Sequence, residues 1–293
     1  MKDAVRLLVY FAATILIGAL LAPVIFWACQ WIAAHGVFPF LAHVPFERFF
    51  RRALLVAALI LLWPLLRSLQ LRSMRDFELV PNPSWTRDLF AGFLLAGIPL
   101  FCGGAALVFI GVYSISPTVN WLGLAKLVPT SVAVPAIEEV FFRGFILGIL
   151  LRTGQRYMPI LLTSGFYSIA HFLKAPDQTS PIVTWTSGFN SMARVFAQFA
   201  DPMLLAASFA TLFLIGLILA DARMQTRSLW LPIGLHAGWI FANGTVGQFT
   251  NVQTIMLPWL GRNLLVGIVP LGIGCLTWLL MRGWIKHYEP RKT

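Results

Sequence analysis

The sequence predicts an all-α polytopic membrane protein with about eight transmembrane helices, for two reasons. Hydrophobic residues make up 58% of the 293 residues and charged residues only 11%, and the mean hydropathy is +0.79. The apolar residues also gather in runs of roughly 20, the length that crosses the hydrocarbon core of a bilayer. No polar block is long enough for a separate soluble domain, so we expect residues 1–293 to form a single membrane domain.

The first predicted span follows Lys2 and Arg6 at the N-terminus. Its apolar run extends from about Val5 to Ile32, which is longer than the roughly 7–15 apolar residues of a signal peptide. We therefore expect a retained first helix. The 35–50 segment, rich in Phe and Pro, is expected to be a loop or an interfacial piece. The 177–201 stretch is a long polar connection that would cover a site or admit a substrate.

The remaining apolar runs predict further spans of similar composition. We expect residues 128–249 to provide the catalytic core helices, with the active site inside the helical bundle. The runs are Ala53–Leu69, Leu89–Tyr113, Val128–Leu151, Met158–Leu173, Met203–Ala220, Leu229–Phe249 and Leu264–Ile285.

The net charge of +11 indicates membrane topology and not a nucleic-acid partner, because basic residues gather in cytoplasmic loops. Lys and Arg are more frequent in the segments that an inside N-terminus would place in the cytoplasm, such as 67–87 and 282–292. We therefore expect an integral multi-pass protein of a bacterial plasma membrane with both termini cytoplasmic. Its expected partners are the lipid bilayer and a membrane-associated protein or peptide, with no nucleic acid.

Only a few ionisable side chains lie inside the predicted spans, and each costs roughly 2.5–3.5 kcal/mol to insert into a bilayer. Such residues usually face other protein and serve a function. They are Glu138, Glu139 and Arg143 in the fourth predicted span, His171 in the fifth and His236 in the seventh.

The two adjacent glutamates are expected to have different roles. Glu139 and Arg143 are four residues apart, so their charges would pair on one helical face. Glu138 is rotated from Glu139 by about 100° and can point at a different neighbour. We therefore expect Glu139–Arg143 to hold the geometry and Glu138 to be the reactive carboxylate.

The two histidines extend this cluster onto other helices. Tyr167 and Ser168 lie four and three residues before His171 and share its helical face, so either hydroxyl would be able to orient the imidazole. Asn243 returns to the face of His236 after about two turns. A carboxylate with two imidazoles suits activation of water for hydrolysis. Zinc bound by Glu138, His171 and His236 would also match an open catalytic site, and no HExxH motif decides between the metal and the metal-free mechanism.

These motifs resemble those of the CAAX protease and bacteriocin-processing (CPBP, or Abi) family of intramembrane proteases. That family has Glu-Glu-x-x-x-Arg, aromatic-x-x-x-His and His-x-x-x-Asn/Asp motifs on successive core helices. The first is EEVFFR at Glu138–Arg143 and the second is YSIAH at Tyr167–His171, with Tyr where Phe is usual. The third begins at His236, but its fourth following residue is Ile240, which has no polar group.

The resemblance implies that Glu138 is the general base, with His171 as its partner and His236 as an oxyanion or metal contact. It implies cleavage of a peptide bond in a membrane-associated substrate, and we favour peptide maturation or protein sorting over prenyl-tail processing. Two alternatives remain: a proton-coupled transporter, and a non-catalytic scaffold or immunity protein of the same fold. The change at Ile240 is the best support for the scaffold alternative.

Overall fold

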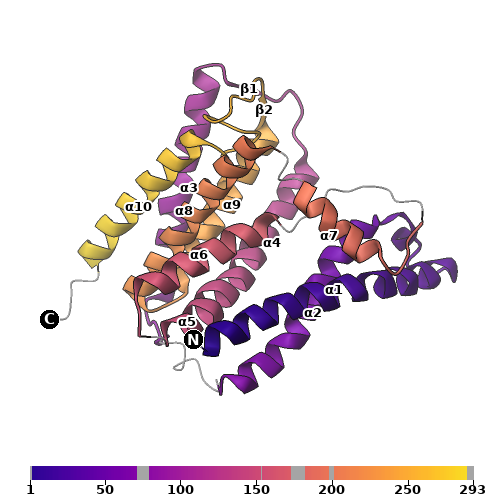
Figure 1. Cartoon of the computed structure of the whole chain (residues 1–293). Helices are drawn as coiled ribbons and strands as arrows, with labels where there is room; N and C mark the ends of the chain where they lie inside the picture. Colours follow the sequence, from indigo (N-terminus) through magenta and orange to yellow (C-terminus); the bar gives the residue numbers. More distant parts are fainter. Residues whose placement is uncertain (1, 71–78, 153, 173–181, 198–200, 289–293) are drawn as a thin grey trace. The chain divides into compact units, whose positions relative to one another are not determined.

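The computed structural model describes residues 2–70, 79–152, 154–172, 182–197 and 201–288, which are mostly helical (Figure 1). Contacts between residues group the chain into two compact units. The first unit contains α1, η1, α2, α7 and the last turn of α6, and the second contains the other elements with most of α6.

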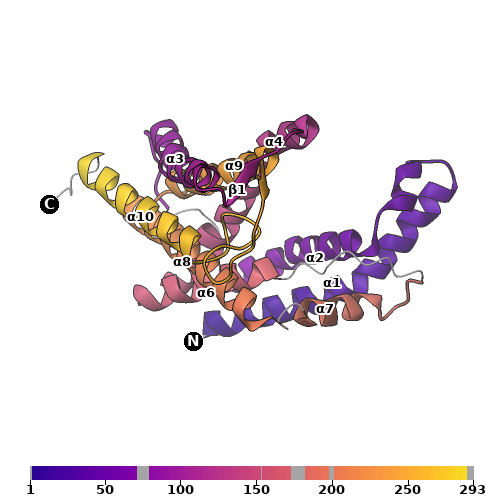
Figure 2. The same ribbon diagram turned by 90° about the horizontal axis from the view of Figure 1, so that it is seen from above.

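In the first unit, the long helix α1 packs against both α2 and α7 (Figure 2). Its core is built from small and aromatic side chains such as Ala19, Phe50 and Val195. The elements are α1 (Lys2–Ala34), the 3-10 helix η1 (Pro39–His43), α2 (Phe46–Ser68) and α7 (Ser187–Ala197).

Both polar segments of the first unit contain helical structure. Residues 35–45, which include η1, form the connection, and the last part of the 35–50 segment belongs to α2, which begins at Phe46 and buries the Phe46 and Phe50 rings. The 177–201 connection contains helix α7, while residues 177–181 and 198–200 lie outside the described part. Within this unit the buried Glu47 carboxylate pairs with Arg194 on α7 at 3.1 Å.

The second unit is a bundle of helices with a short two-stranded ladder at one end (Figure 1). α9 packs against α3, α4 and α8, so it is the central helix of this unit. The strands β1 and β2 pair antiparallel, with Ser114 opposite Asn251. The elements are α3 (Trp85–Phe109), β1 (Tyr113–Ile115), α4 (Trp121–Glu139), the π-helical η3 (Val140–Ile146), α5 (Leu147–Leu151), α6 (Tyr157–Phe172), α8 (Pro202–Thr226), α9 (Trp230–Phe249), β2 (Thr250–Val252) and α10 (Ile268–Tyr288).

The close approach of α3 and α9 depends on glycine. A Cβ on Gly234 of α9 would overlap the carbonyl oxygen of Leu89 on α3, and a Cβ on Gly92 would lie 2.5 Å from the carbonyl oxygen of Leu231. Small residues at helix contacts let backbones approach closely inside a membrane. This contact fixes the helix that carries His236.

We expect Gly234→Ala to destabilise the protein by about 1–3 kcal/mol, because the added methyl group meets backbone that has no room to give. The measurement is unfolding of the purified protein in detergent. Gly247→Ala is the matched control in the same helix, since a Cβ there meets nothing within 4 Å. Equal effects of the two substitutions would contradict the proposed contact.

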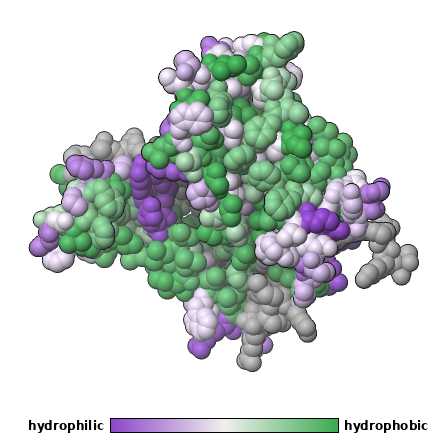
Figure 3. Space-filling model, turned by 180° about the vertical axis from the view of Figure 1, so that it is seen from behind, coloured by the Kyte–Doolittle hydropathy of each residue, from purple (hydrophilic) through white to green (hydrophobic). Residues whose placement is uncertain are grey.

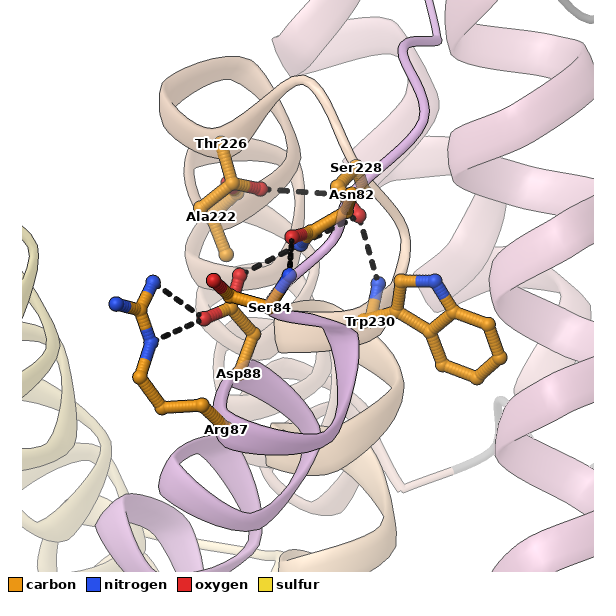
Figure 4. A network of polar contacts seen from close by, with 8 residues as sticks. All are labelled: Asn82, Ser84, Arg87, Asp88, Ala222, Thr226, Ser228 and Trp230. Carbon is orange, nitrogen blue, oxygen red and sulfur yellow. Dashed lines mark hydrogen bonds and ion pairs between the residues drawn. The ribbon is translucent and has the colours of Figure 1, made fainter.

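A polar network joins the start of α3 to the turn between α8 and α9 (Figure 4). The buried Asp88 carboxylate accepts hydrogen bonds from Asn82 at 2.7 Å and from Arg87 at 3.0 Å. Asn82 also donates to the Ser228 hydroxyl at 3.3 Å, and that hydroxyl accepts from the backbone N–H of Trp230. The network holds the starting turn of α9 against α3.

Within the described residues, five helices are long and apolar enough to cross a membrane. Large hydrophobic side chains are exposed along them, and hydrophobic residues cover most of the face seen in Figure 3. The chain is therefore a polytopic membrane protein. The five helices are Val5–Ala34, Phe46–Ser68, Trp85–Phe109, Pro202–Thr226 and Ile268–Tyr288.

The other three predicted spans form helices that do not meet this criterion. Residues 128–151 are divided among α4, η3 and α5, and α6 has only 16 residues. α4 and α9 carry polar side chains and glycines, which lower their hydropathy. These three segments are the ones predicted to carry the chemistry, and polar residues there face other protein.

Candidate functional site

The Glu-Glu-x-x-x-Arg motif lies where α4 passes into the π-helical segment η3. The Asn120 side chain caps the start of α4 by accepting from the backbone N–H of Gly123 at 2.9 Å. Helix α4 ends at Glu139, and η3 then carries Arg143. Pro135, one turn before the glutamates, has no N–H to donate to the helix. Single π-helical turns occur frequently at functional sites, so the local backbone itself marks this segment.

Glu139 and Arg143 form a buried ion pair, as their spacing predicted. Arg143 Nη1 donates to Glu139 Oε1 at 2.9 Å, and both side chains are 0% exposed. Arg143 Nη2 donates to the carbonyl oxygen of Gly216 on α8 at 3.2 Å. The guanidinium also lies 4.4 Å from the centre of the Tyr167 ring on α6. One arginine thus ties η3 to α6 and α8.

His236 of α9 lies between the two glutamates. Its Nδ1 is 2.8 Å from Glu139 Oε1, and its Nε2 is 3.9 Å from Glu138 Oε2. Because the Glu139 carboxylate is paired with Arg143 and can only accept, we assign the proton to Nδ1, which leaves Nε2 facing Glu138. The Glu138 side chain is 29% exposed, against 0% for Glu139 and 5% for His236. Glu138 is therefore the accessible carboxylate of the pair.

Tyr167 contacts the same imidazole at Nε2, the nitrogen that faces Glu138. Its hydroxyl oxygen lies 3.5 Å from His236 Nε2, and its ring meets Phe142 edge-on at 5.2 Å. The structure places this hydroxyl beside His236, and its action on His171 stays a prediction. Tyr167 thus supplies a polar group next to the histidine whose own motif has the apolar Ile240.

The other predicted site residues have different surroundings. Asn243 accepts a hydrogen bond from the backbone N–H of Leu264 at 3.2 Å, so its amide is used in holding the segment before α10. His171 is half-buried in the last turn of α6, one turn beyond Tyr167. Its role toward Glu138 stays a prediction, since Ile169–Asp201 belong to the other compact unit.

An apolar cavity of about 1030 Å³ adjoins the site within the second unit. Val140, next to Glu139, and Ala237, next to His236, both line it, together with Phe93 of α3 and Trp230 of α9. The cavity therefore presents apolar surface beside the helical turns that carry Glu139 and His236.

The zinc expectation finds no support in the donor groups. Among the described residues, no three His, Cys, Asp or Glu side chains are grouped so as to hold a metal ion. Nδ1 of His236 and Oε1 of Glu139 are already engaged with each other, which leaves Glu138 and Nε2 of His236 in this unit. These two donors are fewer than the three protein ligands of a catalytic zinc site.

Three site contacts were not predicted from the sequence. They are the Gly216 carbonyl, the contact between Tyr167 and His236, and the packing of α6 on α8. A Cβ on Gly216 would lie 2.9 Å from Ser164, and Ser168 donates to the carbonyl oxygen of Phe209 at 3.0 Å. The small residues Ser164 and Ser168, four apart in α6, were the available signal for this contact.

The fold and this cluster define a polytopic membrane protein with a buried Glu–Arg–His site on three core helices. Residues 120–242 match the family model described as Rce1-like, type II CAAX prenyl endopeptidase Rce1-like. This range runs from the cap of α4 into α9 and includes all three motifs. Residues 120–242 are therefore identified as an Rce1-like CAAX endopeptidase domain, a domain of a peptidase family, as the motifs indicated. A search of curated proteins and a search of solved structures each give no match.

Proposed function

We propose that this chain is an intramembrane endopeptidase that hydrolyses a peptide bond in a membrane-associated protein or peptide. The observation that carries the proposal is the position of His236 between a locked carboxylate, Glu139, and an accessible one, Glu138. The family to which residues 120–242 belong supports the same reaction.

In this mechanism Glu138 is the general base. It takes a proton from a water molecule as the water attacks the scissile carbonyl, and it later gives that proton to the leaving amine. Glu138 suits this role because its side chain is partly exposed and can be reached by water. Glu139 does not, because it is buried and paired with Arg143.

His236 is positioned by Glu139 and faces the reacting water with Nε2. The acceptor on Nδ1 fixes the ring and its tautomer, as a carboxylate does for histidines in other hydrolytic sites. The Tyr167 hydroxyl beside Nε2 is placed to stabilise the developing oxyanion or to orient the imidazole. We keep His171 as a second imidazole acting on the water, one turn beyond Tyr167.

We further propose eight membrane crossings with both termini in the cytoplasm of a bacterial cell. The five long apolar helices would be completed by the α4–η3–α5 segment, α6 and α9. Basic residues of the second unit support this orientation. Arg87 lies over Trp284 near the end of α10, and Arg156 and Arg282 line one cavity beside the same helix, which runs away from the β1–β2 ladder in Figure 1. Peptide maturation or protein sorting is the process that we favour.

The test is a comparison of membrane proteins and peptides from cells carrying the wild-type chain or Glu138→Gln. We expect longer precursors to accumulate in the variant and the mature forms to return with the wild type. Asp3→Asn is the charge-matched control, because Asp3 lies in the first turn of α1. Identical profiles for wild type and Glu138→Gln, with equal amounts of protein in the membrane, would reject the proposal.

We expect Tyr167→Phe to lower the cleavage rate about three- to tenfold, which is the usual contribution of one neutral hydrogen bond. Stability should be unchanged, because the ring keeps its contacts with Arg143 and Phe142. The measurement pairs initial rates with unfolding in detergent. Tyr113→Phe is the control, since within the described residues its buried hydroxyl has no hydrogen-bond partner. A full rate in Tyr167→Phe would assign the tyrosine to packing alone.

A further inference from the structure

A second cavity lies away from the proposed active site, between α6, α8 and α10 of the second unit. Its volume is about 740 Å³. Unlike the apolar cavity beside His236, it is lined by polar and charged side chains, among them Arg156, Tyr157, Gln225, Trp278 and Arg282. The proposed peptidase mechanism uses none of these residues.

The acidic group in this cavity is already neutralised. Asp221 is 8% exposed, and its carboxylate accepts from Arg282 at 2.6 and 3.0 Å and from Trp278 Nε1 at 2.7 Å. Gln225 donates to it at 3.3 Å. Asp221 therefore holds the Arg282 guanidinium at the cavity and leaves N–H groups of its Nη1 and Nη2 unused.

Arg156 supplies the second guanidinium and an uncompensated charge. It is exposed just before the first turn of α6 and makes no ion pair with any residue that the structure describes. Two guanidinium groups and a single carboxylate line the cavity, so its net charge is positive. Guanidinium groups bind phosphate oxygens through paired N–H groups, which makes an anionic phosphate the fitting ligand.

The position of the cavity indicates where the phosphate comes from. The cavity lies at the end of the unit where the basic residues gather, which the positive-inside bias assigns to the cytoplasmic leaflet. Tyr157 and Trp278 are of the residue types that anchor helices at headgroup depth. Leu161 and Leu217 extend the wall with apolar surface, and basic pockets between transmembrane helices on this side accept anionic headgroups.

We infer that this cavity binds the phosphate of an anionic phospholipid from the cytoplasmic leaflet, with Arg156 and Arg282 as the phosphate contacts. The inference goes beyond the proposed peptidase function and does not depend on it. A bound headgroup would bridge the start of α6 and the last turns of α8 and α10, which carry its lining residues.

The test uses the purified full chain, freed of lipid in a non-ionic detergent and titrated with phosphatidylglycerol while native mass spectrometry counts the bound lipid. Phosphatidylcholine is the zwitterionic comparison, and inorganic phosphate tests for a soluble ligand. We expect Arg156→Gln to weaken phosphatidylglycerol binding about tenfold, the usual effect of losing a charge-assisted contact. Lys286→Gln removes the same charge from exposed α10 surface outside the cavity and should leave binding unchanged.

The outcomes distinguish binding in the cavity from non-specific attraction of an anionic lipid to the basic surface of the protein. Tighter binding of phosphatidylglycerol than of phosphatidylcholine, lost in Arg156→Gln alone, supports it. Equal losses in Arg156→Gln and Lys286→Gln, or no loss in either, overturn it. Displacement of the lipid by millimolar inorganic phosphate would also overturn it, by assigning the cavity to a soluble anion. Circular dichroism of each variant verifies folding, and Arg156→Lys, which keeps the charge but not the fork, should bind with intermediate strength.

Discussion

Replacing Glu138 by Gln should lower kcat/KM for the native substrate by about 100- to 10,000-fold, the range that a positioned general base contributes. Glutamine keeps the shape of the side chain but cannot accept the proton of the attacking water. The substrate for this assay is a precursor identified by the membrane comparison above, and the reading is the initial rate with the purified variant. The variant should still fold, because Glu138 is partly exposed and the buried Glu139–Arg143 pair stays intact.

Two further substitutions show whether the effect belongs to the base. Glu138→Asp retains a carboxylate on a shorter chain and should keep a measurable part of the rate. Glu139→Gln should reduce both stability and rate, since Glu139 accepts from Arg143 and from His236. Cleavage by Glu138→Gln at the wild-type rate would show that Glu138 is not the general base. It would favour the alternative functions, a transporter or a scaffold.

Replacing Arg143 by Met should destabilise the protein by about 3–5 kcal/mol, the usual result of breaking a buried ion pair by removing one partner. The Glu139 carboxylate would be left buried with only His236 as a donor, and the Gly216 carbonyl would lose its partner. The measurement is unfolding of the purified variant in detergent or mixed micelles.

Arg6→Met provides the control for this prediction. Arg6 pairs with Asp3 at 3.0 Å, but both side chains are partly exposed, so its loss should cost about 1 kcal/mol or less. If Arg143→Met were no less stable than Arg6→Met, the ion pair would not be the structural centre of the site. A loss of activity without a loss of stability would instead give Arg143 a direct role in the reaction.

The sequence predicted the membrane class, most helix positions and the residues of the central cluster. Long apolar runs identify spans because a bilayer crossing requires about 20 apolar residues. The predicted bounds of α1, α3 and α9 lie within several residues of those in the structure. The spacing of Glu139 and Arg143 predicted their ion pair, because helical geometry alone places side chains four residues apart together.

Contacts between helices were harder to predict, because hydropathy and spacing describe one helix at a time. Nothing in the YSIAH motif indicates that the Tyr167 hydroxyl turns toward His236 on α9. The π-helical turn at Val140–Ile146 has no composition signal, and a backbone carbonyl such as that of Gly216 has no sequence signature. The predicted number of about eight spans included three runs that carry the site. In the structure these runs are shorter or more polar helices than the other five.

Helix α8 is part of the site, although it carries none of the motifs. The link begins at Oε1 of Glu139, which contacts both Arg143 and His236. Arg143 reaches from this oxygen to the Gly216 carbonyl, and Gly216 itself lies against Ser164 of α6. A side chain added at position 216 would push α6 from α8 and carry Tyr167 and the arginine with it. Random mutagenesis for loss of cleavage should therefore recover changes along α8 that touch no reacting group, and an alignment of family motifs alone would underestimate how much of the chain the chemistry constrains.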